Sequence, residues 1–201
     1  MSDIAILFDG GHFRHLAKKS GMEPTPDLVE DFVHATLRPN ENLFRVLYYD
    51  CRPYNGKQRR PVSGEELEFS LYAGWMDEIG RRDHFALRLG HLKFRGWQLR
   101  DDAIGDDADL EDDDFVPVFE QKGVEIKMGL DIARCADTKM VKKLFVVSGD
   151  TDLVPALKFA RASGLEIIMI QPPGWQLHDL LKMHSDECRE VEWPPQRDAG
   201  Y

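Results

Sequence analysis

Residues 144–170, with the sequence LFVVSGDTDLVPALKFARASGLEIIMI, decide the fold class of this chain. An apolar run leads into Ser148-Gly149-Asp150, and a helical pattern then extends to Gly164, where a second apolar run begins. Short apolar runs bounded by turn residues are typical of buried parallel strands. The segment therefore predicts a strand–helix–strand crossover, and such crossovers are right-handed.

The rest of the chain repeats this alternation of strands and helices. We expect strands over residues 4–9, 42–51, 143–150 and 165–171; a strand, a glycine break and another strand over 84–97; helices over 12–21, 25–37, 65–80, 152–164 and 175–186; and a strand start or turn leading into a helix over 122–137. Residues 52–66 and 101–117 are expected to be loops. Strands that alternate with helices predict an α/β fold with a largely parallel sheet.

The composition is typical of a soluble globular protein, with 42% apolar and 31% charged residues in a chain of 201. This length fits one domain, or one domain with a large insertion, and we expect a single domain over 1–193 and a frayed tail over 194–201. No apolar run is long enough to predict a membrane span, and the N-terminus lacks the pattern of a secretory signal. Three separated cysteines fit a reducing cytoplasm, where we expect the protein to act.

The acidic charge is concentrated in one segment. The net charge is −10, yet residues 101–114 hold nine acids and no base, which leaves 27 acids against 26 bases elsewhere. Residues 57–100 carry nine Lys or Arg against six acids. This segregation is compatible with a phosphate-bearing partner. The acidic run itself is expected to be a solvated loop; the alternatives are that it lines a groove, repels wrong substrates or acts as an internal mimic of nucleic acid.

Three aspartates stand where a strand leads into the next element, and a fourth lies within a helix. Asp9 ends the first strand before Gly10-Gly11, Asp150 ends the strand of the opening segment, Asp152 begins the helix that follows, and Asp131 lies in an earlier helix. Ligands of parallel sheets lie beyond the C-terminal ends of the strands, so these carboxylates can converge there. They would repel one another without a cation, and oxygen ligands favour Mg²⁺ or Mn²⁺. Such an ion supports phosphodiester hydrolysis.

Each aspartate taken alone has a simpler interpretation. Asp9 is typical of a turn or cap, Asp152 suits the cap of its helix, and Asp131, three residues before Arg134, suits an ion pair. Only the joint pattern favours metal binding. The chain contains no P-loop motif, no dinucleotide-binding glycine motif and no nucleophile elbow.

Three segments carry a resemblance to a known family: ILFDGGHF at 6–13, QKGVEIKMGLDIARCA at 121–136, and the opening segment. Together they resemble the NYN domain family (LabA-like), a branch of the PIN-like nuclease superfamily. The resemblance is specific over residues 4–13 and 121–171 and weaker between them. It implies a Rossmann-like three-layer α/β/α sandwich with a mainly parallel central sheet. It also implies a divalent metal and RNA cleavage.

The resemblance implies that Asp9, Asp131, Asp150 and Asp152 are the catalytic and metal-binding residues, with Mg²⁺ or Mn²⁺ as the cofactor. Asp9 and Asp150 would be the direct ligands. Asp131 and Asp152 would ligate the ion, hold a metal-bound water or act through it.

Three polar residues near these aspartates are candidates for substrate binding. Ser148 and Thr151 either orient water and contact phosphate or make turn hydrogen bonds only. His12 stands where many relatives carry Asn, and it either hydrogen-bonds phosphate or water or simply starts a helix. Glu125 stands where relatives often carry Asp, and its longer reach changes the geometry.

Single-stranded RNA needs cations for its backbone and flat groups for its bases. The available residues are Arg59, Arg60, Arg81, Arg82, Lys93, Arg95 and Arg100, with Tyr54, Trp75 and Trp97 interleaved. Of these we expect Arg95 to bind substrate. The simpler alternative is a solvated basic face with Trp75 in the core.

These observations predict a cytoplasmic, Mg²⁺- or Mn²⁺-dependent endoribonuclease that acts on single-stranded RNA and does not associate with a membrane. The family resemblance also allows a homodimer. The main alternative is a non-catalytic RNA- or protein-binding regulator on a PIN-like fold. A third is a phosphatase or nucleotidase for small esters. A nuclease should cut oligonucleotides and ignore small phosphate monoesters.

Overall fold

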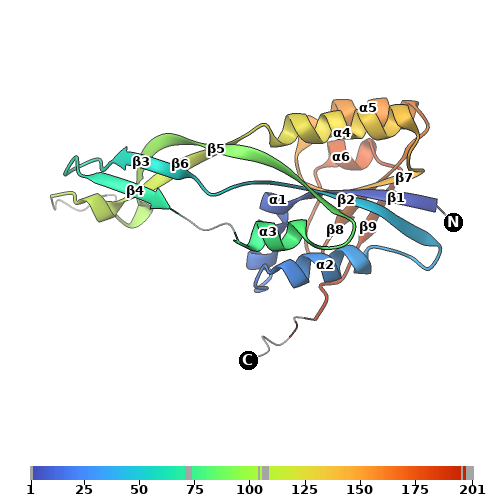
Figure 1. The fold of residues 1–201 in the computed structure, drawn as a ribbon, viewed down its shortest axis with the longest axis horizontal. Coiled ribbons are helices and arrows are strands. Elements are labelled where there is room, and N and C mark those ends of the chain that lie inside the picture. Colours follow the sequence, from blue (N-terminus) through green and yellow to red (C-terminus); the bar gives the residue numbers. More distant parts are fainter. Residues whose placement is uncertain (1, 71–73, 104, 106–108, 196, 198–201) are drawn as a thin grey trace. The chain divides into compact units, whose positions relative to one another are not determined.

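The computed structural model describes residues 2–70, 74–103, 105, 109–195 and 197, which form two compact units (Figure 1). The first unit comprises Met1–Asp50, Gly74–Leu89 and Val124–Tyr201, and the second comprises Cys51–Ala73 and Gly90–Gly123. The second unit is thus built from two segments that interrupt the first along the sequence.

The first unit is a mostly parallel sheet flanked by helices. Its strands are β1 (Ser2–Asp9), β2 (Glu41–Cys51), β5 (Phe85–Leu99, whose second part belongs to the second unit), β7 (Lys143–Val147), β8 (Glu166–Gln171) and β9 (Glu187–Glu190). Its helices are α1 (Gly10–Lys19), α2 (Pro26–Ala35), α3 (Gly74–Gly80), α4 (Val124–Thr138), α5 (Val154–Ala162) and α6 (Asp179–Met183), with 3₁₀ turn η3 (Thr151–Leu153) before α5.

The strand order is β5-β2-β1-β7-β8-β9, and the pairings of β1 with β2 and β7, of β7 with β8, and of β8 with β9 are parallel. Phe8 is opposite both Tyr48 of β2 and Val147 of β7. The C-terminal ends of these three strands therefore lie at one edge of the sheet, which brings Asp9 level with the residues that follow β7.

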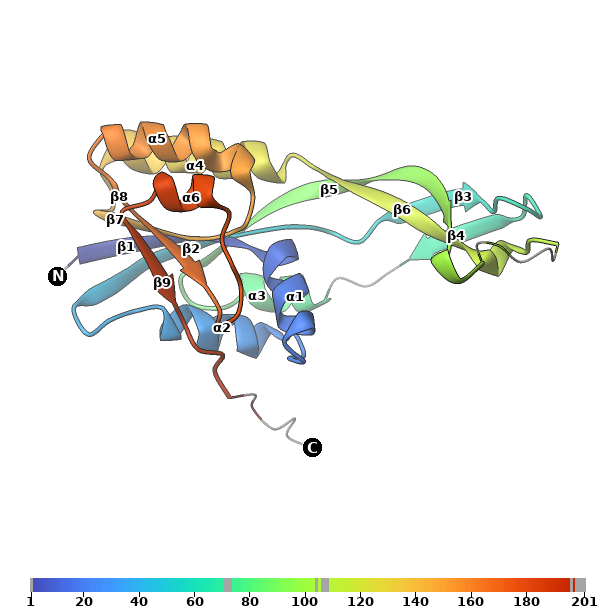
Figure 2. The ribbon, with the colours of Figure 1, turned by 180° about the vertical axis from the view of Figure 1, so that it is seen from behind.

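Helices cover both faces of this sheet. Figures 1 and 2 show α1, α2 and α3 on one face and α4, α5 and α6 on the other. On the first face, Phe8 of β1 packs in a buried cluster with Phe13 of α1, Phe32 of α2 and Ile79 of α3. Residues 4–8 of β1 are buried throughout, as expected of a central parallel strand. The predicted α/β fold with a mainly parallel, helix-covered sheet is confirmed.

Local sequence signals set two of the helix ends. Thr25 caps α2, because its hydroxyl oxygen accepts a hydrogen bond from the backbone N–H of Leu28 at 3.1 Å, and Pro26 occupies the first turn. Helix α5 ends before Gly164, whose φ of +87° is a conformation that suits glycine. No helix within residues 2–70, 74–103, 109–195 has the length and apolar character to cross a membrane.

The second unit consists of antiparallel strands. Strand β3 (Asn55–Arg59) pairs with β4 (Glu66–Ser70), and the second part of β5 pairs with β6 (Phe115–Lys122) around a bulge between Phe94 and Gly96. Half-buried aromatic rings with centroids 5.2 to 6.4 Å from their neighbours join these strands; they are Tyr54, Phe69, Phe94, Trp97 and Phe119. These rings are the apolar centre of the unit.

Several predictions for this region are wrong. Residues 52–66 are not a loop, because β3 lies within them, and 65–80 is not one helix, because β4 precedes α3 and residues 71–73 lie outside the described part. In β4, half-buried and exposed residues alternate, which is the period of a strand. Strand β5 also continues through 84–97 without the expected glycine break.

The acidic run and the C-terminal part also differ from prediction. Within 101–117 the chain forms two 3₁₀ turns, Asp101–Ala103 and Asp112–Asp114, and β6 begins at Phe115, while residues 104 and 106–108 are outside the described part. Helix α6 is far shorter than the predicted 175–186, and β9 was not predicted. The predicted tail 194–201 lies mostly outside the described residues, although Arg197 pairs with Asp31 at its start.

Candidate functional site

Asp9 ends β1 and caps α1. One carboxylate oxygen accepts a hydrogen bond from the backbone N–H of His12 at 2.9 Å, and the other accepts from the hydroxyl of Ser148 at 3.2 Å. Burial raises the pKa of Asp9 above its usual value, and the nearby carboxylates of Asp50 and Asp150 raise it further, against the effect of the two hydrogen bonds. Asp9 is therefore a half-buried acid that faces negative charge.

Ser148 connects Asp9 to the segment after β7. Its side chain is 1% exposed, and its hydroxyl oxygen also accepts a hydrogen bond from the backbone N–H of Asp150 at 3.2 Å. Asp150 in turn caps the 3₁₀ turn η3, because its carboxylate accepts from the backbone N–H of Asp152 at 2.8 Å. We call Asp9, Ser148 and Asp150 the strand-end site. Beside it, Thr151 is half-buried and Asp152 is exposed.

His12 packs on the loop that carries Ser148. Its ring meets Trp175 edge-on with centroids 5.6 Å apart, and a Cβ at Gly149 would lie 2.7 Å from the ring carbon Cε1. Only glycine permits this close approach. Burial, and then the charge of His15, lowers the pKa of His12 to about 4. At neutral pH its ring is therefore uncharged and able to donate one hydrogen bond and accept another.

Asp50 is a further strand-end carboxylate that sequence reasoning did not select. It lies near the end of β2 with a 1% exposed side chain. Arg14 holds it with two hydrogen bonds, one of them 2.9 Å from Nη2 to Oδ1, and the Tyr48 hydroxyl donates to it at 3.3 Å. The sequence signal that could have identified Asp50 was its position at the end of a strand, because β2 ends beside β1 at the same sheet edge. Trp175, which packs on His12, carried no comparable signal.

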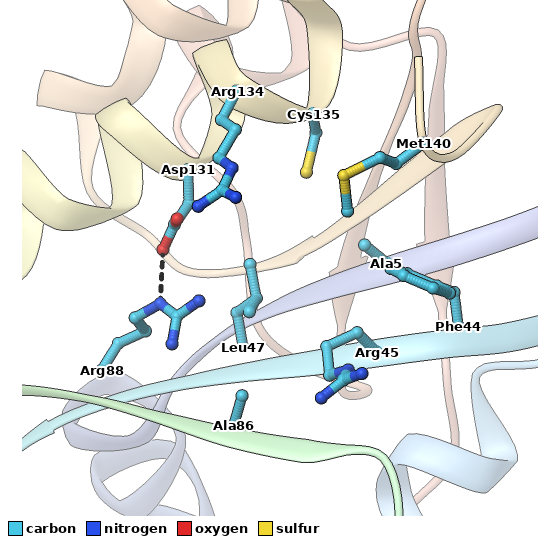
Figure 3. A pocket seen from close by; sticks show the side chains of 10 residues that line it. All are labelled: Ala5, Phe44, Arg45, Leu47, Ala86, Arg88, Asp131, Arg134, Cys135 and Met140. Carbon is cyan, nitrogen blue, oxygen red and sulfur yellow. Dashed lines mark hydrogen bonds and ion pairs between the residues drawn. The ribbon is translucent and has the colours of Figure 1, made fainter. Parts of the chain in front are cut away.

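Asp131 is not in contact with the other three predicted aspartates. The Tyr49 hydroxyl donates to its Oδ2 at 2.7 Å. Arg88 Nε donates to the same oxygen at 2.9 Å (Figure 3). Its side chain is 15% exposed. Among the four predicted aspartates, hydrogen bonds connect Asp9 to Asp150 through Ser148 and Asp150 to the backbone of Asp152, whereas Asp131 has other partners. The ion-pair alternative describes Asp131.

Arg95 belongs to the second unit. It is the bulged residue of β5, and its guanidinium pairs with Glu120 of β6. This pair, followed by the hydrogen bond from Lys122, lowers the pKa of Glu120.

Within the described part of the chain, no three His, Cys, Asp or Glu side chains are arranged as a metal-binding group. The strand-end site nonetheless fits the chemistry of Mg²⁺, which proteins hold through one or two carboxylates while the ion keeps several waters. Asp9 and Asp150 supply two carboxylates, and the charge of Asp150 raises the pKa of Asp9, a repulsion that a cation would relieve.

Comparison with known proteins bears on the fold. No family model matches the chain, and no curated protein matches it. The crystal structure of a protein of unknown function from Vibrio parahaemolyticus RIMD 2210633 is similar, with a TM-score of 0.55 at 14% sequence identity over 94% of this chain and 93% of that chain. At this identity the likeness concerns the fold alone.

Proposed function

We propose that this chain is a Mg²⁺- or Mn²⁺-dependent endoribonuclease of the NYN type on a PIN-like fold. The observation that carries the proposal is the convergence of Asp9 and Asp150, through Ser148, at the C-terminal edge of a mostly parallel sheet. This edge is where open α/β sheets bind their ligands. The proposed substrate is single-stranded RNA, and the proposed location is the cytoplasm. A homodimer is one proposed oligomeric state of the protein.

Asp9 and Asp150 would hold the ion. When bound, the ion offsets negative charge on phosphate oxygens and acidifies a bound water. The Ser148 hydroxyl fixes the orientation of the Asp9 carboxylate, and the helix cap fixes Asp150. His12, uncharged at neutral pH, can hydrogen-bond a phosphate oxygen or a water at the same edge. Exposed Asp152 and half-buried Thr151 are the nearest further polar groups.

A specific observation favours the second candidate, a non-catalytic regulator that binds RNA or a protein. The carboxylate of Asp131 already has a cationic partner in Arg88 and a hydroxyl partner in Tyr49. If this pairing persists with substrate present, the site has fewer free carboxylates than the family resemblance implies.

The deciding experiment is cleavage of labelled single-stranded RNA with Mn²⁺, Mg²⁺ or EDTA. Asp150→Asn removes the charge but keeps an oxygen that can cap η3, so the local fold is retained. The matched control is Asp137→Asn, which removes the same charge at an exposed position of α4. We expect metal-dependent cleavage in the wild type and in Asp137→Asn, and none in Asp150→Asn.

Other outcomes point elsewhere. Cleavage that persists in EDTA or in Asp150→Asn would rule out the proposed metal site. RNA that is bound but left intact with Mn²⁺ present supports the regulator. Hydrolysis of p-nitrophenyl phosphate without RNA cleavage supports a small-ester phosphatase.

A further inference from the structure

A pocket of about 160 Å³ lies between β2, β5 and α4 in the first unit (Figure 3). Part of its lining is apolar and buried: Leu47 is 7% exposed and Cys135 is 6% exposed. Burial, followed by the charge of Asp131, raises the pKa of the Cys135 thiol, so this side chain adds an uncharged surface. This lining suits an apolar group.

The rest of the lining is strongly basic. Three arginines line the pocket, Arg45, Arg88 and Arg134, against the single carboxylate of Asp131. Asp131 pairs with Arg88. Among the described residues, neither Arg45 nor Arg134 makes an ion pair, and both are exposed to solvent. The pocket therefore carries an excess of two positive charges beside an apolar surface.

We propose that this pocket binds a small organic anion, a ring-sized apolar body that carries one phosphate or carboxylate group. Guanidinium groups match both anions with paired hydrogen bonds, which makes arginine the preferred residue for such recognition. The volume is close to that of a cavity of about 150 Å³ that takes up benzene. The inference rests on Arg45, Arg88 and Arg134 and not on the proposed nuclease activity.

The test is titration of the whole chain by isothermal calorimetry with simple probes. Phenyl phosphate and benzoate carry both features of the proposed ligand, benzamide lacks the charge, and inorganic phosphate lacks the ring. We expect phenyl phosphate or benzoate to bind, and benzamide and inorganic phosphate to bind at least about tenfold more weakly. Comparable binding of phenyl phosphate and benzoate would indicate a site that accepts either anion, and a preference would show which group it is built for.

Variants connect binding to the pocket. Arg45→Gln and Arg134→Gln each remove a charge-assisted hydrogen bond to the anion and should weaken binding about tenfold or more. Ala86→Phe places a ring in the space that the ligand would occupy and should abolish binding. The matched control, Arg81→Gln, removes the same charge at an exposed position outside the pocket and should bind normally. Asp150→Asn should also bind normally, which separates this site from the proposed nuclease.

Three results would overturn the proposal. The first is no binding of phenyl phosphate or benzoate at millimolar concentration. The second is binding that survives both Ala86→Phe and Arg45→Gln. The third is that the arginine variants bind an RNA oligonucleotide more weakly while phenyl phosphate does not bind at all. That result would mean that the arginines contact a nucleic-acid backbone.

Discussion

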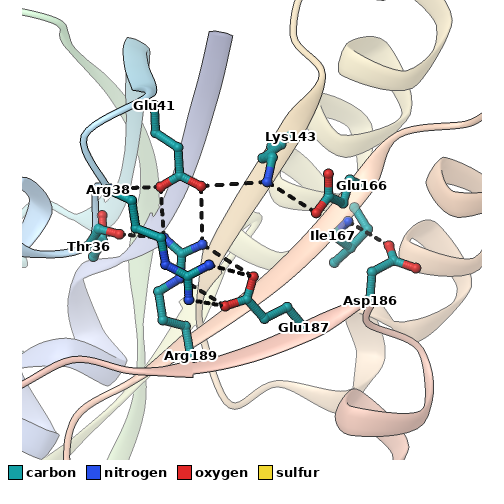
Figure 4. Close-up of polar contacts among 9 residues, drawn as sticks. All are labelled: Thr36, Arg38, Glu41, Lys143, Glu166, Ile167, Asp186, Glu187 and Arg189. Atoms are coloured by element: carbon teal, nitrogen blue, oxygen red, sulfur yellow. Dashed lines mark hydrogen bonds and ion pairs between the residues drawn. The ribbon is translucent and has the colours of Figure 1, made fainter. Parts of the chain in front are cut away.

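Arg189 of β9 is the centre of a buried ionic network that offers a sharp test of what stabilises the first unit (Figure 4). Its side chain is 7% exposed and lies over the ring of Phe145 at 4.7 Å. The guanidinium donates to the carbonyl of Thr36 at 2.7 Å and to both oxygens of Glu41, at 2.8 and 3.1 Å. It also donates to Glu187 at 3.2 Å.

We expect Arg189→Met to lower the free energy of unfolding by about 3–5 kcal/mol at pH 7, the usual cost of removing one partner from a buried ion pair. The cost is high because the Glu41 side chain is itself only 7% exposed. Its remaining partners are the backbone N–H of Arg38 at 2.9 Å and Lys143 at 3.6 Å. Neither partner replaces the bidentate hydrogen bonds that the guanidinium of Arg189 makes to Glu41.

The loss should depend on pH. Burial alone would raise the pKa of Glu41, but the hydrogen bonds from Arg189 and Arg38 lower it to about 2 from an ordinary 4.5. A lowered folded-state pKa gives stability that is complete above pH 4.5 and is lost as the pH falls toward 2. The shift corresponds to about 3 kcal/mol. About 2 kcal/mol of it should be gone at pH 3, and the deficit of Arg189→Met shrinks by the part of this amount that the Arg189 hydrogen bonds supply.

Urea unfolding followed by circular dichroism at pH 7 and pH 3 measures both effects. The matched control is Arg38→Gln, whose 58% exposed side chain pairs with Glu187 at the surface and should cost less than about 1 kcal/mol. The double variant Glu41→Met with Arg189→Met should recover part of the loss, because no buried charge is left unpaired. A cost below about 1 kcal/mol for Arg189→Met, or a deficit that does not change with pH, would refute the reasoning.

Three further substitutions test separate parts of the molecule. Gly10→Ala would place its Cβ 2.8 Å from Oδ2 of buried Asp50, and overpacking there should cost about 1–3 kcal/mol in thermal unfolding. Trp97→Phe removes an indole N–H that donates to a backbone carbonyl at 2.8 Å, and we expect about 1 kcal/mol of lost protection in hydrogen exchange, confined to the second unit. Arg88→Gln removes the cationic partner of Asp131 and should tighten Mn²⁺ binding in calorimetry if this aspartate is a ligand; unchanged affinity would remove it from the site.

The first unit was predictable because its strands are buried on both faces. Residues 143–147 and 166–171 are nearly continuous apolar runs, and the sequence itself marks where they end. Capping by Thr25 and termination at Gly164 were predictable for the same local reason. Strand β9, by contrast, has only four residues, two of them acidic, and its place depends on pairing with β8. No local signal encodes that pairing.

The second unit was not predictable from periodicity. Leu67, Leu71, Trp75 and Ile79 are spaced by four and suggested one helix, although Leu67 and Phe69 lie in strand β4. Strands β3 and β4 have only five residues each, two of them charged, and the aromatic side chains of this unit are only half-buried. Their structure depends on ring contacts between segments far apart in the sequence, such as Tyr54 with Phe119, whose centroids are 5.2 Å apart. Tertiary contacts of this kind override local propensity.

The candidate site was partly predictable for a topological reason. Neighbouring parallel strands end at one edge, so Asp9 and Asp150 had to lie near each other once β1 and β7 were adjacent. The partner of Asp131 was not predictable, because Arg88 lies 43 residues earlier and its approach depends on how α4 packs against β5.

The same edge shows why one buried strand-end carboxylate is structural and another is a candidate ligand. Both oxygens of Asp50 are engaged by the guanidinium of Arg14, so its charge is already neutralised and it has little to offer a metal. Asp9 accepts hydrogen bonds only from a backbone N–H and from the Ser148 hydroxyl, which are neutral donors, and makes no ion pair within the described part of the chain. Each of its oxygens keeps a lone pair free. Asp9 is held by neutral donors and has Asp150 beside it, so the protein does little to neutralise its negative charge. A bound cation would neutralise that charge.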